Sequence, residues 1–289
     1  MSILIQKKTL AVKKNIRKGK KSKGITLTKL FLIATAGLFF VIFTIVVYQY
    51  RDGLLYYLGF KSKDYNAILS KKRNLHDVRI YEVLSLYEEK TIGIDVSQYQ
   101  GIIDWENVGK IDDNFDIDFV IIRATAGSDK VDTQFYTNWE NTKSNFIRGA
   151  YHYFRPDENS MLQAANFIKT VHLSKGDLPP VLDIEQLPQS QSIDKLKIGL
   201  KRWLDKIEQH YGVKPIIYSG ERFYTDFLKE DFSDYKFWIA NYNFWRKEMD
   251  DNWILWQFTE KARVTGINEL VDVNVYKGLK AELIEHGVQ

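Results

Sequence analysis

The chain has no cysteine and lacks several short motifs that mark particular chemistries. Without cysteine, disulfides and thiol chemistry are excluded. There is no G-x-S-x-G nucleophile elbow and no G-x-x-x-x-G-K-S/T phosphate loop, so neither signature supports a serine hydrolase or a nucleotide-binding protein. H-E-x-x-H and H-x-H zinc patterns are also missing. Of the five His, only His152 falls in an expected strand, where we interpret it as a hydrogen-bonded or core residue.

Acidic residues are missing from the first 29 positions, which carry ten Lys and Arg. The whole chain has a formal net charge of +4, so residues 30–289 carry a net charge of −6. A basic tail therefore precedes a mildly acidic body, and nucleic acid is not expected as the partner of the main domain. We interpret residues 1–29 as a basic cytoplasmic tail that orients the chain and contacts anionic lipid, with a nucleic-acid-binding arm as the alternative.

Charge of either sign is absent from residues 30–50, LFLIATAGLFFVIFTIVVYQY. About 20 apolar residues in a helix cross a hydrocarbon core roughly 30 Å thick. The basic residues precede this segment, so the positive-inside rule predicts a single-pass signal-anchor helix with a cytoplasmic N-terminus. The main domain would then lie outside the cell membrane, in a periplasm or the extracellular space. A signal peptide cleaved after Ala34-Thr35-Ala36 and a buried core helix are the alternatives.

The rest of the chain divides into a spacer, a body and a short end. Residues 51–90 are predicted to form a juxtamembrane stalk, because LLYYLGF at 54–60 resembles an interfacial segment and residues 66–89 are charged and weakly helical. Residues 91–282 are predicted to form the catalytic barrel domain, and residues 283–289 a C-terminal tail.

Eight short runs rich in β-branched and aromatic residues follow Thr91 at regular intervals. Helical stretches separate the first five runs, among them residues 160–171, with a Ser160-x-x-Gln163 capping box, and residues 193–210, ended by Gly212. Only loops join the last three. The predicted fold is α/β, an irregular TIM-like barrel of five β/α units followed by three β-strands and preceded by one transmembrane helix. The runs are residues 91–96, 118–125, 149–154, 179–185, 214–220, 236–242, 253–258 and 271–276.

Carboxylates stand near the ends of these runs, where a barrel carries its active site. Asp183 and Glu185 are two positions apart, so on a strand they project from the same face. Two acids in one place repel when both are charged, and one of them then tends to keep its proton. Glycosidic bond cleavage needs such a pair. Asp95 lies near the end of its run as well, whereas Asp272 lies early in its segment and fits this placement less cleanly.

Aromatic residues accompany the acids and suit a sugar, whose C–H groups pack on an aromatic face. Core packing is an equally good explanation for any one of them, so only the collection indicates a saccharide. The candidate substrate-binding residues are Tyr153, Tyr218, Trp238, Tyr242, Trp256 and Gln257.

Taken together, these segments resemble glycoside hydrolase family 25, the Chalaropsis-type lysozymes, over about residues 91–280. The matching segments come in the family's order: GIDVSQYQGIIDW at 93–105, FVIIRATAG at 119–127, GAYHYF at 149–154, LPPVLDIE at 178–185, KPIIYS at 214–219, WIANY at 238–242, WQF at 256–258 and VDVNVY at 271–276.

The resemblance implies an irregular barrel and an N-acetylmuramidase that cleaves the β-1,4 bond between N-acetylmuramic acid and N-acetylglucosamine in peptidoglycan. It implies that Glu185 is the general acid and that Asp183 is a companion that stabilises positive charge or orients the substrate N-acetyl group. Asp95 and Asp272 are implied as flanking acids. One departure is Ala126, where many family members have glutamate.

The expected partners are peptidoglycan glycan strands and, through residues 30–50, a lipid bilayer. No cofactor and no metal are expected, and the chain is expected to be a monomer. Two other functions remain open: a membrane-anchored peptidoglycan-binding protein without turnover, and a metal-dependent polysaccharide deacetylase or phosphodiesterase that uses carboxylate ligands.

Overall fold

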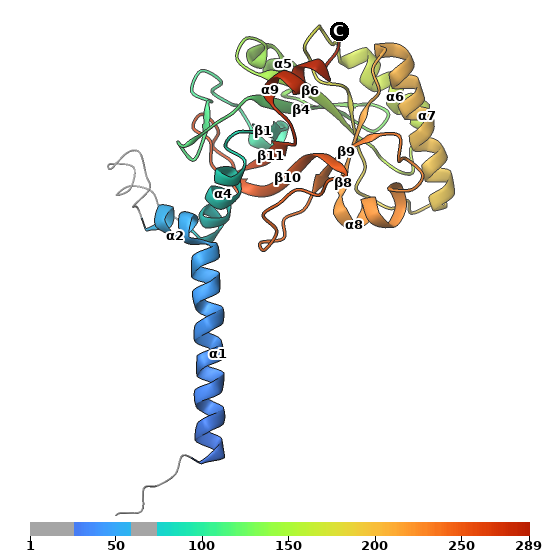
Figure 1. Cartoon of the computed structure of the whole chain (residues 1–289). Coiled ribbons are helices and arrows are strands. Elements are labelled where there is room, and N and C mark those ends of the chain that lie inside the picture. Colours follow the sequence, from blue (N-terminus) through green and yellow to red (C-terminus); the bar gives the residue numbers. More distant parts are fainter. Residues whose placement is uncertain (1–25, 59–73) are drawn as a thin grey trace, which may run out of the picture. The chain divides into compact units, whose positions relative to one another are not determined.

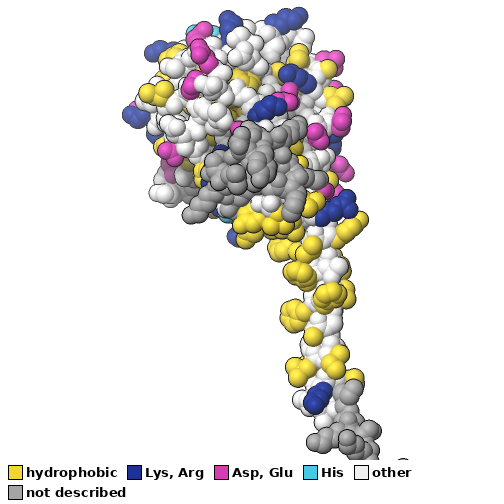
Figure 2. Space-filling model, turned by 90° about the vertical axis from the view of Figure 1, so that its left-hand side faces the viewer, with side chains coloured by type: hydrophobic (Ala, Val, Ile, Leu, Met, Phe, Trp, Pro, Cys, Tyr) yellow, Lys and Arg dark blue, Asp and Glu magenta, His cyan; other side chains and the backbone are white. Residues whose placement is uncertain are grey.

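A computed structural model describes residues 26–58 and 74–289, and the chain divides into two compact units, Met1–Gln49 and Tyr50–Gln289. In the first unit, α1 (Leu27–Gln49) is a helix of 23 residues with hydrophobic side chains along its length (Figures 1 and 2). Within the described residues it is the one helix long and apolar enough to cross a membrane, with a mean hydropathy of 2.8. It covers nearly all of the predicted segment 30–50, and the greater part of the predicted tail lies outside the described residues.

The second unit contains the predicted eight-stranded barrel. Its strands match the eight predicted runs, with ends shifted by a few residues, and short extra strands lie in the connections. The barrel strands are β1 (Thr91–Val96), β4 (Phe119–Ala126), β6 (Ile147–Tyr153), β7 (Val181–Asp183), β8 (Ile216–Gly220), β9 (Lys236–Ala240), β10 (Trp253–Ala262) and β11 (Val271–Tyr276).

The sheet closes because β1 pairs with both β4 and β11. Among the eight barrel strands, all neighbouring pairs from β1 through β10 are parallel. The last strand, β11, runs antiparallel to both β10 and β1. Its first residues therefore lie at the edge of the barrel where the other strands end. Short strands add to this frame: β5 (Lys130–Val131) pairs with β4, and β2 (Lys110–Ile111) with β3 (Phe115–Asp116).

Helices cover the outside of the barrel (Figure 1). They are α5 (Phe135–Thr142), α6 (Ser160–Thr170), α7 (Ile193–Tyr211) and α8 (Glu221–Phe223), the last continued by a π-helical turn over Tyr224–Leu228. The connection after β1 differs from a complete β/α unit, since it contains only the 3₁₀ turn Gln98–Gln100 and the β2–β3 hairpin.

Two local predictions about helix ends have different outcomes. Gly212 adopts a left-handed conformation with φ of 70° directly after α7, as the sequence predicted. The predicted capping box at α6 is wrong: Asn159 is the N-cap, and its Oδ1 accepts bonds from the backbone N–H groups of Met161 and Leu162. The side chain of Gln163 turns inward instead and contacts His152.

The prediction of a stalk over residues 51–90 is wrong for the segment before the barrel. Helix α4 (Leu75–Leu86) buries Ile80, Val83 and Leu84 in the same core cluster as the strands, and it contacts β10. Scattered apolar residues in a charged segment were interpreted as a spacer, but they form the face that α4 packs against the barrel. Helix α2 (Arg51–Tyr57) packs in turn on α4.

The predicted domain boundary at residue 282 is also wrong. Helix α9 (Lys280–Glu285) crosses it and buries Leu283. The end of the chain is held by backbone hydrogen bonds, from the N–H of Gly176 to Val288 and from the N–H of Val288 to Asp177. The barrel unit therefore includes residues that the sequence assigned to a stalk and to a tail.

Candidate active site

All four predicted acids meet at one end of the barrel. Asp95 lies near the end of β1 and Asp183 is the last residue of β7, with Glu185 two positions beyond it. Asp272 joins them because β11 is antiparallel, and its Cα is the direct partner of the Asp95 Cα in the β1–β11 ladder. The early position of Asp272 in its strand, which fitted the sequence prediction poorly, is therefore explained by strand direction.

The chain after β7 is held in place from the neighbouring strand. The backbone N–H of Ile184 donates to the carbonyl of Tyr218 at 3.0 Å, and the Ser219 hydroxyl donates to the carbonyl of Ile184 at 2.6 Å. Ile184 itself is fully buried. These contacts hold Asp183 and Glu185 on one side of the backbone, as the i, i+2 spacing predicted.

The acids line a cavity of about 180 Å³ at the carboxyl ends of the parallel strands. Pockets that enclose a whole drug-sized ligand are larger, about 300–1,000 Å³, so this cavity holds part of a larger substrate. Glu185 lies exposed at its mouth, whereas Asp95 and Asp183 are buried. The lining residues are Asp95, Tyr151, Asp183, Glu185, Tyr218, Trp238, Tyr242, Gln257, Glu260 and Asp272.

Asp95 is held by two side-chain amides. Its Oδ2 accepts bonds from Nε2 of Gln257 at 2.8 Å and from Nδ2 of Asn274 at 2.7 Å. Each amide is oriented by an aromatic donor. The Tyr218 hydroxyl donates to Oε1 of Gln257 at 2.7 Å, and the Trp238 indole N–H donates to Oδ1 of Asn274 at 2.8 Å. Both amide donors therefore point at the Asp95 carboxylate and favour its charged form.

Burial and mutual repulsion shift the pKa values of the acids upward. Desolvation raises the pKa of Asp95 to about 6, against the lowering effect of its two amide donors. Desolvation, then the charge of Asp95, raises the pKa of Asp272 to about 9. The pKa of Asp183 is raised well above its usual range by desolvation and then by the charge of Glu185. Near neutral pH, Asp95 therefore carries charge while Asp272 keeps its proton, and the shift at Asp183 favours its protonated form.

Glu185 differs from Asp183 in its surroundings. Desolvation raises the pKa of Glu185, and a hydrogen bond with Asp183 opposes that shift. Oδ1 of Asp183 is buried without a hydrogen-bond partner. The pair thus has an inner carboxyl that favours its neutral form and an outer carboxyl that is accessible from the mouth of the cavity.

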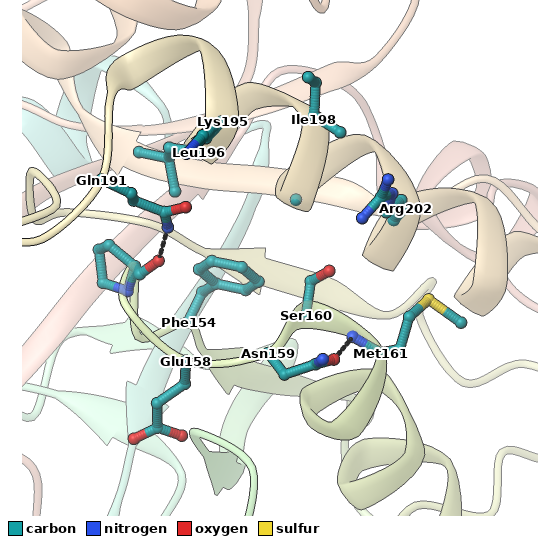
Figure 3. Close-up of a pocket in the computed structure, with 12 residues that line it drawn as sticks. Phe154, Glu158, Asn159, Ser160, Met161, Gln191, Lys195, Leu196, Ile198 and Arg202 are labelled. Carbon is teal, nitrogen blue, oxygen red and sulfur yellow. Dashed lines mark hydrogen bonds between the residues drawn. The ribbon is translucent and has the colours of Figure 1, made fainter.

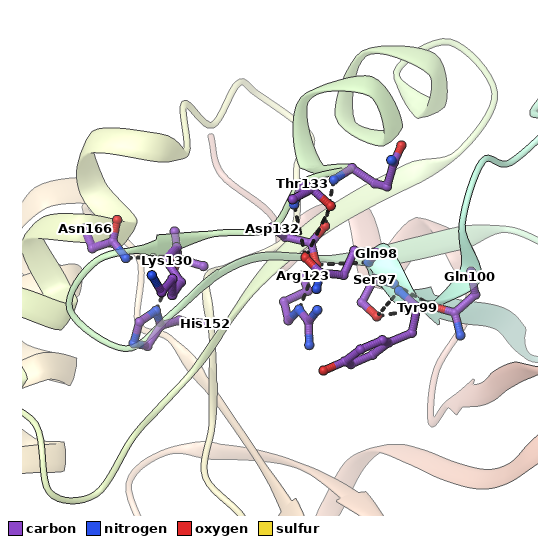
Figure 4. A network of polar contacts seen from close by, with 12 residues as sticks. Ser97, Gln98, Tyr99, Gln100, Arg123, Lys130, Asp132, Thr133, His152 and Asn166 are labelled. Atoms are coloured by element: carbon purple, nitrogen blue, oxygen red, sulfur yellow. Dashed lines mark hydrogen bonds and ion pairs between the residues drawn. The ribbon is translucent and has the colours of Figure 1, made fainter.

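Arg123, a cation that the sequence analysis missed, belongs to a network of polar contacts with Asp132 (Figure 4). The pKa of Asp183 is raised mainly by desolvation, and the positive charge of Arg123, on β4, opposes this rise. The Nε of Arg123 donates to Oδ2 of Asp132 at 2.8 Å, and its guanidinium lies 4.6 Å from the ring centre of Tyr99. Oδ2 of Asp132 also accepts from the backbone N–H of Gln98 at 2.9 Å, which joins the loops after β1 and β4. The sequence feature that could have identified Arg123 is the presence of an arginine within a predicted barrel strand.

The predicted substrate-binding residues differ in whether they line the cavity and in how exposed they are. Tyr218, Trp238, Tyr242 and Gln257 line the cavity, but Tyr218 and Trp238 are buried and serve its hydrogen-bond network, so they offer no open ring face. Tyr242 is 44% exposed, and its hydroxyl also bonds to Oε1 of Gln257. Tyr153 is half-buried beside Asp183 and does not line the cavity.

The prediction for Trp256 is wrong. Gln257 points into the barrel, so its neighbour Trp256 points outward, since successive side chains on a strand alternate. Trp256 is 0% exposed, and its indole N–H donates to the carbonyl of Asn241 at 3.1 Å. The sequence analysis also left out Tyr151 and Glu260, which line the cavity. Alternation along GAYHYF placed Tyr151 on the same face as Tyr153 and could have identified it.

His152 is a core residue, as the sequence analysis interpreted it. It is fully buried, its Nδ1 lies 2.7 Å from the Thr125 hydroxyl, and its Nε2 lies 3.1 Å from Oε1 of Gln163. Desolvation lowers its pKa to about 4, so the ring is neutral. Across residues 26–58 and 74–289 no group of three or more His, Asp or Glu has a geometry that could hold a metal ion.

A larger cavity of about 380 Å³ lies between α6 and α7 (Figure 3). Its lining includes Phe154, Ser160 and Arg202, and a single carboxylate, Glu158. Glu158 is already bonded to Ser128 and Arg155. This cavity has the greater volume but no pair of carboxyls, so the smaller, acid-lined cavity is the candidate active site.

Comparisons with known proteins agree with the geometry. The sequence model of glycosyl hydrolases family 25 matches residues 94–267, which include Asp95, Asp183 and Glu185, and Asp272 lies just beyond its end. The YegX protein of Escherichia coli K12 is 42% identical over 194 residues, which are 66% of this chain and 71% of that protein. Lysozyme M1 of Streptomyces globisporus is 28% identical over 66% of this chain and 69% of its own length.

Solved structures show the same fold. A family 25 glycosyl hydrolase from Bacillus anthracis is 30% identical with a TM-score of 0.61, over 69% of this chain and 94% of that one. A bacterial lysozyme from Streptomyces coelicolor is 27% identical with a TM-score of 0.61, over 68% of this chain and 97% of that one.

Proposed function

Because this chain belongs to glycosyl hydrolases family 25 and is a glycoside hydrolase, we propose that its acid-lined cavity cleaves the β-1,4 bond between N-acetylmuramic acid and N-acetylglucosamine in peptidoglycan. The observation that carries the proposal is the meeting of Asp95, Asp183, Glu185 and Asp272 in one cavity, where burial raises the pKa of Asp95 to about 6 and that of Asp272 to about 9. Enzymes that hydrolyse glycosidic bonds use such a division of protonation states.

Glu185 is the proposed general acid. It is the carboxyl at the mouth of the cavity, where a glycosidic oxygen approaches, and its raised pKa favours the protonated form. Proton donation leaves a carboxylate on Glu185, which accepts a hydrogen bond from the protonated Asp183 beside it. Asp183 thereby stabilises the conjugate base of the acid, and its Oδ1 is buried without a protein partner.

Asp95 is the proposed source of negative charge for the oxocarbenium-like transition state. Two amide donors hold it as a carboxylate, and its charge is a cause of the raised pKa of Asp183, Asp272 and Tyr151. Positive charge that develops on the sugar ring is favoured in a cavity with this fixed anion. Asp272, whose pKa is raised to about 9, is neutral at the same pH and adds no charge.

Product analysis tests the reaction. Purified peptidoglycan digested with the enzyme is expected to give fragments with N-acetylmuramic acid at the new reducing end, identified by reduction with borohydride and mass spectrometry. New reducing ends on N-acetylglucosamine would show that the other glycosidic bond is cut. Loss of acetyl groups with intact glycan would identify a deacetylase. Full activity after exhaustive EDTA treatment would remove a metal-dependent reaction.

The pH profile tests the role of Asp95. We expect kcat/KM to fall below a pH of about 6, because protonation of Asp95 removes its charge. In Asn274→Leu one amide donor is lost, the charged form of Asp95 is less favoured and its pKa rises. The acid limb of the profile is therefore expected to move to higher pH. An acid limb that stays in place while activity falls uniformly would contradict this role.

Helix α1 is the proposed membrane anchor, with the N-terminus in the cytoplasm and the barrel outside. Its length and apolar surface support the proposal, and so do the basic residues that precede it in the sequence. In cell fractionation the full-length chain should remain with the membrane after sodium carbonate extraction. Recovery of a soluble chain whose N-terminus lies after residue 36 would identify α1 as a cleaved signal sequence.

A further inference from the structure

The first residue after α1 is fixed to the barrel unit beside its active site. Tyr50 belongs to the Tyr50–Gln289 unit and is 3% exposed. Its ring stacks on Phe244 at a centroid distance of 5.5 Å and meets the edge of Trp245 at 5.9 Å. Its hydroxyl donates to the carbonyl of Phe244 at 3.2 Å. The loop between β9 and β10 is therefore packed against the first residue of the barrel unit.

This part of the unit has the chemistry of a membrane interface. Trp245 is 64% exposed. The ammonium of Lys247 lies 3.8 Å from the ring centre of Tyr50 and is paired with Glu82 at 3.2 Å, so Lys247 serves the packing of this region. In α2, Gly53 and Tyr56 are buried while Leu55 is exposed, and Leu58, directly after the helix, is exposed as well. An exposed tryptophan beside exposed leucines is typical of a protein surface that meets the headgroup region of a bilayer. We call Leu55, Leu58, Phe244 and Trp245 the aromatic patch; the buried Tyr50 packs against its two aromatic members.

The same loop reaches the active site. Tyr242, two residues before Phe244, bonds to Gln257, which holds Asp95. Cα atoms two residues apart are separated by at most about 7 Å. A small cavity of about 80 Å³ includes Tyr242 and Glu260, which also line the active site, together with Phe244 of the aromatic patch. The mouth of the active site and the aromatic patch are thus adjoining surfaces of one unit.

We propose that the aromatic patch rests on the phospholipid surface of the membrane and holds the active site against it, so that the substrate is glycan close to the bilayer. The inference rests on the proposed anchor. If α1 spans the bilayer, Gln49 ends at the interface and Tyr50 follows at the next position, so its contacts Phe244 and Trp245 lie at that interface by chain connectivity. Glycan strands attached to lipid are then within reach of the cavity.

A single-site label tests where the patch lies. The chain has no cysteine, so Trp245→Cys gives one labelling site for an environment-sensitive dye in the full-length protein. The matched control is Ile198→Cys on α7, also an exposed apolar side chain at 53% exposure. Both proteins are inserted into vesicles of phosphatidylethanolamine and phosphatidylglycerol that contain nitroxide-labelled lipid. We expect lipid quenching of the dye at position 245 and none at position 198.

Each outcome of the labelling experiment decides the proposal. Equal, weak quenching at both positions in a chain that resists carbonate extraction would overturn the docking proposal and leave the anchor intact. A chain that carbonate removes from the vesicles would overturn the anchor and the docking proposal together. Neither outcome affects muramidase activity on purified peptidoglycan, so failure here is distinguishable from failure of the proposed reaction.

An activity comparison tests the substrate. Trp245→Ser is expected to lower the cleavage rate of lipid-linked glycan in the same vesicles about tenfold, the effect of about 1.4 kcal/mol of lost surface contact. Cleavage of soluble glycan fragments should change less than twofold, because Trp245 does not line the catalytic cavity. An equal fall on both substrates, or no fall on either, would contradict a role of the patch in substrate choice.

Discussion

Glu185→Gln is expected to lower the rate of peptidoglycan hydrolysis about 10²–10⁴-fold, the usual contribution of a general acid. Glutamine has nearly the same shape and still reaches the mouth of the cavity, but it has no proton to donate to the leaving oxygen. The fold should be retained, since Glu185 is exposed and packs in no core cluster. Release of soluble reducing ends from purified peptidoglycan measures the effect.

Two further measurements make this result specific. Glu230→Gln, an exposed glutamate beyond α8, is the matched control and should keep full activity. Sedimentation with peptidoglycan should be unchanged in Glu185→Gln, because the cavity remains in place. Equal hydrolysis by the wild type and Glu185→Gln would refute the assigned acid. If both proteins bind peptidoglycan and neither releases reducing ends, the chain is a binding protein without turnover.

Asp272→Asn is expected to stabilise the protein by up to about 4 kcal/mol at pH 7, because roughly three pKa units separate this pH from the usual pKa of the carboxyl, at about 1.4 kcal/mol for each unit. Desolvation, then the charge of Asp95, raises the pKa of Asp272 from 3.8 to about 9. Between these values the folded state keeps a proton that the unfolded state has lost. The free energy of unfolding therefore decreases as pH rises through this window. Asparagine cannot ionise, so the variant does not lose this part of the free energy of unfolding as pH rises.

Chemical denaturation in detergent at pH 4, 7 and 9 measures the effect on stability. The stabilisation by Asp272→Asn should be small at pH 4, where Asp272 is protonated in the folded state, and larger at pH 7 and 9. Asp129→Asn, whose side chain is 65% exposed, is the control and should change stability by less than about 0.5 kcal/mol. Equal pH dependence in the wild type and Asp272→Asn would show that Asp272 is not the group responsible.

A stabilising substitution at an active-site acid would also be informative about function. Asp272 is positioned by its pairing with Asp95, and their closeness costs stability because both are partly removed from water. Sites of this kind are kept for activity rather than for stability. We therefore expect Asp272→Asn to reduce hydrolysis while raising resistance to denaturant.

The strands of the barrel could be predicted because each has a local pattern. Runs such as 91–96 and 236–242 are short, β-branched or aromatic, and bounded by turns, so they are visible without tertiary information. The structure confirms the predicted barrel. Helix α4 was missed as a barrel element because its apolar residues are diluted by charge. Its buried face became clear only when Ile80, Val83 and Leu84 met the strands.

The sequence predicted some residues of the site and missed others, because only local patterns are visible in a sequence. The spacing of Asp183 and Glu185 is a local feature of the sequence. The alternation of side chains along a strand is local as well, and it could have shown that Gln257 faces the cavity and Trp256 does not. The partners of Asp95 are Gln257 and Asn274, which lie more than 160 positions away in the sequence. Such partners follow from strand register, which no local pattern specifies.

By itself, the sequence determined the apolar N-terminal helix, the eight strands and the acids that stand near their ends, because charge, periodicity and spacing act over a few residues. Only the tertiary structure decided that β11 runs antiparallel and brings Asp272 beside Asp95. It also decided which acids are charged, because pKa values depend on burial and on neighbours from other strands. These properties arise from contacts between distant segments, and they exist only after the barrel has closed.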